Sequence, residues 1–211
     1  MGRGSPHCRG RLPGQARCGT QLARWVAKEG GKSVSRSVQG LEWARVMEKA
    51  PHRAPRGLRG AKAKGVAFEK ALLGALGPRA RGGIWLEFCD SNGRGYCQPD
   101  ILLKLSHQCL LILEAKYTWT WEGHQQLENL YRPVVRAALR GTWQILTVQV
   151  CKLLTPETPR QAVFASLEAA LAASHAGKMA VCHWPCGALE PLFVPPLGGH
   201  PQVLDKPALV A

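Results

Sequence analysis

The sequence has no uninterrupted apolar stretch of about 18 residues, the length that a membrane-spanning helix requires. The first residues also lack the apolar segment of a secretory signal peptide. Acidic residues are absent before Glu29, as in organellar transit peptides, but the glycines and prolines there disfavour a long amphipathic helix. We therefore expect an intracellular protein without a membrane partner, in the cytoplasm or nucleoid, with organellar targeting as the alternative.

The eight cysteines do not form the regular pattern of a disulfide scaffold. Cys109 and Cys151 lie in apolar runs, where cysteine behaves as a small hydrophobic residue. This distribution fits a reducing compartment. The segment Cys182–Cys186 has Cys, His and Cys at its first, second and last positions and resembles half a zinc site. No second ligand pair of standard spacing follows it, so zinc is not expected.

Positive charge is concentrated near the N-terminus. The formal net charge is +14, and residues 1–64 contain 15 Lys and Arg against three acids, a net of +12. The other residues contain 13 Lys and Arg and 11 acids, so their net charge is +2. A basic segment attached to a nearly neutral body is typical of proteins that contact polyanions. Nucleic acid is the expected partner, with a solvated tail or an anionic membrane surface as alternatives.

Composition also predicts how the chain is divided. Residues 1–60 are expected to form a basic arm. It contains short helices at Thr20–Lys28 and Ser37–Lys49 and ends in a Pro- and Gly-rich linker at Pro51–Gly60. Residues 61–195 are expected to form one domain, and residues 196–211 a tail.

Hydrophobic periodicity within this domain alternates between helical and strand patterns. A first helix is predicted over Lys62–Leu76, ended by Gly77 and Pro78. The predicted segments that follow are strands Ile84–Asp90, Tyr96–Leu105 and Cys109–Tyr117, helix Glu122–Arg140 with a kink at Pro133, strand Trp143–Leu153, helix Pro159–His175 and a strand pair within Met179–Val194. This order, α-β-β-β-α-β-α, predicts an α/β fold with a central mixed sheet.

Two carboxylates are predicted to face each other across a hairpin. If Ser106–Gln108 form its loop, the numbers of facing residues sum to 214, and Asp100 lies opposite Glu114. Both strands are apolar runs, so charges at their ends are costly unless something compensates them. A divalent cation between the carboxylates makes them a ligand pair, and carboxylate oxygens suit Mg²⁺. The alternative is a surface ion pair of Glu114 with Lys116, and a loop of another length would move Asp100 away.

Lys116 and Glu69 extend this candidate site. Lys116 is two residues beyond Glu114 and therefore lies on the same face of the sheet, where its charge can orient a water and stabilise a developing anion. Glu69 falls within the apolar arc of its helix, between Phe68 and Leu72, so it points toward the sheet. It is a further metal ligand, direct or through water, or else it reaches past the apolar face to solvent.

These residues resemble the signature of the PD-(D/E)XK nuclease superfamily. Pro99-Asp100, 13 intervening residues and Glu114-Ala115-Lys116 match its motif, including the proline. Gly65–Glu69 resembles the preceding helix with its acidic ligand, and Gln126–Tyr131 resembles the Gln-and-Tyr helix of the exonuclease branch. There the Gln usually precedes the Tyr by four residues, whereas Gln126 precedes Tyr131 by five, which makes Gln125 a rival. The resemblance covers about residues 62–155.

The resemblance implies a restriction-endonuclease-like fold and metal-dependent hydrolysis of phosphodiester bonds. Asp100 and Glu114 would hold Mg²⁺ (or Mn²⁺), with the carbonyl of Ala115 and the carboxylate of Glu69 as further ligands. Lys116 would position the attacking water, and Gln126 would complete the catalytic set. DNA is the expected substrate, because the superfamily mostly acts on DNA, while endonuclease and exonuclease activity both remain open.

Two other classes of function are alternatives to a nuclease. One is a catalytically inactive nucleic-acid-binding protein on the same fold, which has no need for facing carboxylates. The other is a small-molecule enzyme with a carboxylate metal site, which leaves the basic arm unexplained. Trp119 and Trp121 follow Lys116 and are expected either to pack in the core or to stack on an unpaired base.

Overall fold

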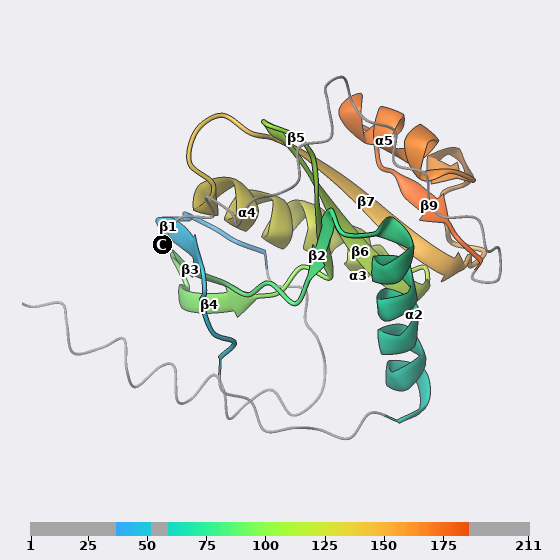
Figure 1. The fold of residues 1–211 in the computed structure, drawn as a ribbon, viewed down its shortest axis with the longest axis horizontal. Helices are drawn as coiled ribbons and strands as arrows, with labels where there is room; N and C mark the ends of the chain where they lie inside the picture. The colour runs from blue at the N-terminus through green and yellow to red at the C-terminus, as the bar shows by residue number, and fades with distance from the viewer. Residues whose placement is uncertain (1–36, 52–58, 186–211) are drawn as a thin grey trace, which may run out of the picture. The chain divides into compact units, whose positions relative to one another are not determined.

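The computed structural model describes residues 37–51 and 59–185, which contain two β-sheets and the helices that cover them (Figure 1). The larger sheet has its six strands in the order β2-β5-β6-β7-β9-β8. Their bounds are β2 Ala80–Gly82, β5 Ile101–Ser106, β6 Cys109–Thr118, β7 Gln144–Leu153, β9 Val181–His183 and β8 Val163–Phe164. Neighbours from β2 to β6 are antiparallel and those from β6 to β8 are parallel. The predicted α/β class with a mixed sheet is confirmed.

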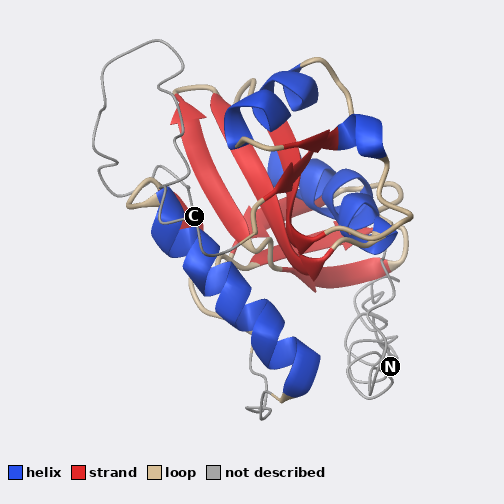
Figure 2. Cartoon of the chain, turned by 90° about the vertical axis from the view of Figure 1, so that its right-hand side faces the viewer, coloured by secondary structure: helices blue, strands red, loops and turns tan. Residues whose placement is uncertain are grey.

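Helices cover both faces of the larger sheet (Figure 2). On one face, α2 (Gly60–Leu76) and α5 (Leu167–His175) bury their apolar side chains against β5, β6 and β7. On the other face lie α3 (Trp121–Gln126), the π-helical segment η1 (Leu127–Tyr131) and α4 (Arg132–Ala138). Strands buried on both faces explain the continuous apolar runs of the sequence.

The first long helix follows the prediction closely. The strand after it, β2, was not predicted, and the predicted strand Ile84–Asp90 is β3 (Leu86–Asp90) of the smaller sheet. Helix α2 ends where Gly77 adopts a φ of 72°, a left-handed conformation that glycine takes without a steric penalty. The predicted strand Tyr96–Leu105 is instead two strands, β4 (Gly93–Cys97) and β5, because Pro99 has no N–H for a strand ladder. In the larger sheet the order α2-β2-β5-β6-α3/α4-β7 gives the α-β-β-β-α-β succession, with β2 as its first strand.

The smaller sheet has the order β1-β3-β4, with β1 at Trp43–Val46 and β3 at Leu86–Asp90. The helix predicted over Ser37–Lys49 is therefore wrong. Ala44 and Val46 pack in the core while Trp43 and Arg45 lie on the opposite side, which is the two-residue period of a strand. Pairing with β3 overrides the local helical pattern. Part of the expected basic arm thus lies within the folded unit.

The segment predicted as one kinked helix, Glu122–Arg140, contains the π-helical turn η1 just before Pro133. Proline has no N–H to donate to the carbonyl four residues earlier, that of Asn129. The N–H of Val38 donates to this carbonyl at 2.9 Å, so the break also anchors the chain that leads into β1. Such π-helical insertions are frequent at functional sites.

The predicted helix Pro159–His175 is correct only in its second half. Residues Arg160–Ala162 form a 3₁₀ turn, η2, and Val163–Phe164 form the edge strand β8. Helix α5 begins after Ser166, whose hydroxyl oxygen accepts a hydrogen bond from the N–H of Ala169 at 3.2 Å. The predicted Thr20–Lys28 helix, most of the linker, the tail and the second strand of the pair within Met179–Val194 lie outside the described residues.

Candidate active site

The hairpin of β5 and β6 sets the relation between the two predicted carboxylates. The register runs from Ile101 opposite Leu113 to Lys104 opposite Leu110, and these facing numbers sum to 214 as predicted. The predicted three-residue loop is wrong, because Ser106 already pairs with Cys109. A bulge between Lys104 and Ser106 adds one residue to β5 and so preserves the face on which each side chain lies.

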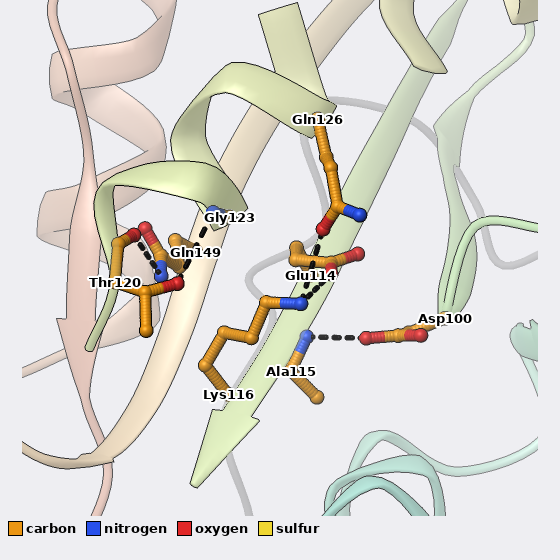
Figure 3. A network of polar contacts seen from close by, with 8 residues as sticks. All are labelled: Asp100, Glu114, Ala115, Lys116, Thr120, Gly123, Gln126 and Gln149. Atoms are coloured by element: carbon orange, nitrogen blue, oxygen red, sulfur yellow. Dashed lines mark hydrogen bonds and ion pairs between the residues drawn. The ribbon is translucent and has the colours of Figure 1, made fainter. Parts of the chain in front are cut away.

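Asp100 lies directly before β5, beside the strand that carries Glu114 (Figure 3). The N–H of Ala115 donates to Asp100 Oδ2 at 2.8 Å, which holds the carboxylate at the end of the hairpin. In an extended strand the N–H and C=O of one residue point to the same side. The carbonyl of Ala115 therefore also faces the side of β6 on which Asp100 lies, and its role as a metal ligand stays a prediction.

Glu114 is almost completely buried, with 2% of its side chain exposed. Its Oε1 lies 2.5 Å from Lys116 Nζ. Its Oε2 is also buried, and no described residue donates a hydrogen bond to it. Burial and the neighbouring charge of Asp100 raise the pKa of Glu114 to about 8. Burial likewise raises the pKa of Asp100, although the N–H of Ala115 opposes this shift.

Lys116 connects the carboxylates to the helix that follows. Its Nζ donates to Gln126 Oε1 at 3.0 Å, which brings Gln126 into contact with the candidate site (Figure 3). Burial lowers the pKa of Lys116, but the charges of Glu114 and Asp100 outweigh burial and raise it above its usual value. Lys116 is therefore a cation at neutral pH. Its side chain is 28% exposed.

Three residues that sequence reasoning missed hold this arrangement in place. Gln149 lies opposite Glu114 in the parallel pairing of β6 with β7, and its Nε2 donates to the carbonyl of Thr120 at 3.1 Å. The Thr120 hydroxyl in turn accepts from the N–H of Gly123. A Cβ atom on Gly123 would lie 2.5 Å from Gln149 Nε2 and 3.1 Å from Lys116 Cε, so glycine lets α3 approach both side chains. A polar residue within the apolar run of β7 was the available signal for Gln149.

No family model, curated protein or solved structure matches this chain. A functional assignment therefore depends on the geometry of the side chains themselves. Within residues 37–51 and 59–185, no helix is long and apolar enough to cross a membrane.

Glu69 lies near the carboxylates but does not join them in a compact group. Burial and the charge of Asp100 raise the pKa of Glu69, which places it within electrostatic reach of the site. In the described part of the chain, no three His, Cys, Asp or Glu side chains gather closely enough to hold a metal ion by themselves. A role for Glu69 as a ligand, direct or through water, stays a prediction.

The two tryptophans proposed for base stacking differ in exposure. Trp119 is buried and packs in a small apolar cluster with Cys151 and Val181, so base stacking by Trp119 is excluded by its burial. Trp121 is 48% exposed and lies 5.3 Å, centroid to centroid, from His124. Cys182 is buried in the main core, whereas Cys186 of the half zinc site lies outside the described residues.

Proposed function

We propose that this protein is a metal-dependent nuclease that hydrolyses phosphodiester bonds of nucleic acid, with DNA as the preferred substrate. The observation that carries the proposal is the buried oxygen Oε2 of Glu114, which has no hydrogen-bond donor among the described residues and lies beside a second carboxylate, Asp100. Lys116 contacts only the other oxygen, Oε1, so Oε2 is a buried polar atom that a bound cation would provide with a partner.

The donor set fits a hard divalent cation. Two carboxylates and a backbone carbonyl, from Asp100, Glu114 and Ala115, are oxygen ligands of the kind that Mg²⁺ and Mn²⁺ accept. Mg²⁺ usually takes only one or two protein carboxylates and keeps several waters, so the lack of a third carboxylate in contact is compatible with it. When bound, such an ion supplies Lewis-acid activation of a water and of a phosphoryl oxygen.

The chain's own residues supply the rest of the reaction. Lys116 carries a positive charge next to Glu114, and its side chain is partly exposed, so it can hold the attacking water and offset charge on the phosphate. Gln126 accepts a hydrogen bond from Lys116 and fixes the direction of its ammonium group. Asp100 and Glu114 would bind the metal ion and orient it, and no covalent intermediate with the protein is needed.

The arrangement of elements supports the restriction-endonuclease-like fold within the broader α/β class. The α-β-β-β-α-β succession places Asp100 before one hairpin strand and Glu114 and Lys116 at the end of the next. The helix that follows then returns Gln126 to the same face. This is the order that the resemblance to the PD-(D/E)XK superfamily implies.

The test is cleavage of labelled linear, circular and branched DNA by the full chain, in Mg²⁺, in Mn²⁺ or in EDTA. We expect cleavage only with a metal ion. D100N and E114Q should reduce it to background, and K116Q should slow it by about 10²- to 10³-fold. The matched control is E128Q, which should leave the cleavage rate unchanged. Glu128 is also a carboxylate, but it is paired with Arg132 and Thr147.

Two results would change the proposal. Cleavage by D100N at the rate of the unmodified chain would remove the assigned site. DNA binding without cleavage in either metal would replace the nuclease with the second class of function, a catalytically inactive nucleic-acid-binding protein. The linear and circular substrates also separate exonuclease from endonuclease activity.

A further inference from the structure

The smaller sheet has one face that does not contribute to the core. Its core-facing residues, such as Val46, Leu86 and Phe88, pack on the cluster that includes α4. The opposite face, here called the outer face, has two cross-strand rows. They are Trp43, Cys89 and Arg94 in the first row and Arg45, Glu87 and Tyr96 in the second.

Glu87 organises the cations of the outer face. Its side chain is only 4% exposed, whereas those of Arg45 and Arg94 are 65% and 43% exposed. Arg45 contacts Oε2 of Glu87 through Nε at 2.8 Å and through Nη2 at 2.6 Å. Arg94 Nε lies 3.3 Å from the other oxygen, Oε1, which also accepts a hydrogen bond from the hydroxyl of Tyr96 at 3.3 Å.

These contacts leave the guanidinium groups able to bind an anion. A guanidinium has five N–H donors, and Glu87 engages two nitrogens of Arg45 and one of Arg94. Two cations against one carboxylate give the cluster a net charge of +1. Because a buried ion pair contributes little net stability, its main effect here is to hold two arginines in fixed directions.

The outer face also offers aromatic surface beside these cations. The guanidinium carbons of Arg45 and Arg94 lie 5.7 Å and 5.9 Å from the ring centroid of Trp43. Trp43 and Tyr96 are both partly exposed. Oriented arginines interleaved with aromatic rings on a sheet are the combination that binds unpaired nucleic acid, through phosphates and through stacked bases.

We propose that the outer face binds a single strand of nucleic acid and guides it to the site at Asp100 and Glu114. The inference deepens the proposed nuclease function and rests on it for the destination of the strand. Only three residues separate Tyr96 from Asp100, so their Cα atoms are at most about 14 Å apart. A duplex conceals the faces of its bases, so stacking on Trp43 favours an unpaired substrate.

The test measures binding of a labelled single-stranded oligonucleotide, and of its duplex, to the full chain in EDTA at several salt concentrations. R45Q/R94Q should flatten the single-strand log-affinity versus log-salt slope by about 1.4, since each lost phosphate contact removes about 0.7. The affinity deficit should then be about sevenfold larger at 50 mM than at 200 mM salt. W43L should weaken single-strand binding about fivefold or more and leave duplex binding unchanged.

Two further variants keep the result interpretable. R136Q/R140Q removes the same charge from exposed positions of the α4 region and should leave the slope unchanged. The double variant R45Q/R94Q leaves the buried carboxylate of Glu87 without its arginine partners and could therefore unfold. R45Q/E87Q/R94Q removes all three charged groups and avoids this problem. Its slope should be flattened as in the double variant, with R136Q alone as the control of equal net charge.

The outcomes separate this inference from the nuclease proposal. Because binding is measured without a metal, flattened slopes support the outer face even if no DNA is ever cleaved. Equal slopes for R45Q/R94Q and R136Q/R140Q would overturn the inference even if D100N abolishes cleavage. Equal loss of duplex and single-strand binding in W43L would exclude base stacking and overturn the assignment to a single strand.

Discussion

Replacement of Glu114 by glutamine should stabilise the metal-free protein while it removes activity. Glu114 is buried at the site, its Oε2 has no hydrogen-bond donor in the described structure, and its pKa is raised from 4.5 to about 8. Glutamine has nearly the same shape, keeps an oxygen for Lys116 and replaces the other oxygen with an amide donor next to Asp100. The variant thus replaces a carboxyl whose ionisation is suppressed by burial with a neutral amide, and it creates no cavity.

The sign and size of this effect depend on pH. Below pH 4.5 the carboxyl is protonated in the folded and the unfolded states, so the ionisation of Glu114 does not change stability there. Between 4.5 and about 8 the unfolded chain releases the proton that the folded chain keeps, so stability falls as pH rises. At pH 7, about 2.5 units above 4.5, this lowers the free energy of unfolding of the unmodified protein by roughly 3 kcal/mol, since one pH unit corresponds to about 1.4 kcal/mol.

The assay is urea-induced unfolding of both proteins from pH 5 to pH 8.5 in EDTA, repeated with Mg²⁺. E114Q should be the more stable protein at pH 7, and its advantage should shrink toward pH 5. Mg²⁺ should reduce the difference, because it binds and stabilises only the unmodified chain. E128Q is the control and should lose stability, because Glu128 is paired with Arg132 and Thr147. An E114Q protein less stable than the unmodified chain in EDTA would refute the reasoning and make Glu114 a structural ion-pair partner of Lys116.

Two further predictions concern the neighbours of this carboxylate. If Glu69 binds the metal ion, E69Q should raise the Mg²⁺ concentration needed for half-maximal cleavage about tenfold without lowering the urea midpoint of unfolding. An unchanged metal titration would instead favour a Glu69 side chain that only reaches to solvent. G123A should lower the free energy of unfolding by about 1–3 kcal/mol and slow cleavage about 10²-fold, because the new Cβ displaces the side chains of Gln149 and Lys116. G65A is the control, because a Cβ at Gly65 would meet no neighbouring side chain within 4 Å. A G123A protein as active as G65A would show that the close approach of α3 to these side chains is dispensable.

The relative placement of Asp100 and Glu114 was more predictable from the sequence than the elements that support the candidate site. Asp100 and Glu114 flank apolar runs, and the two-residue period of a strand is strict, so their relation depended only on parity. The loop length was predicted incorrectly, but the bulge in β5 compensates for the missing loop residue. The bulge lies at Leu105, which is buried in the core, and no local sequence pattern predicts it.

The errors share a physical cause, which is that tertiary partners outweigh local preference. The residues around Trp43 have a helical pattern, yet pairing with β3 and the hydrogen bond from Val38 to Asn129 make the segment extended. The partner carbonyl is available because Pro133 follows it by four residues in another part of the chain. Reasoning from one segment at a time does not combine two such features.

Gln149 shows the same limit at the level of a single side chain. Its sequence neighbours are apolar, so a local reading places it in a buried strand and gives it no role. In the fold it lies opposite Glu114 on the parallel neighbour strand and hydrogen-bonds to Thr120. Its own Oε1 is buried and has no donor among the described residues, as is the case for Glu114 Oε2. Two buried side-chain oxygens without a donor among the described residues thus lie on facing residues of adjacent strands, and the proposed metal ion would provide a partner for that of Glu114.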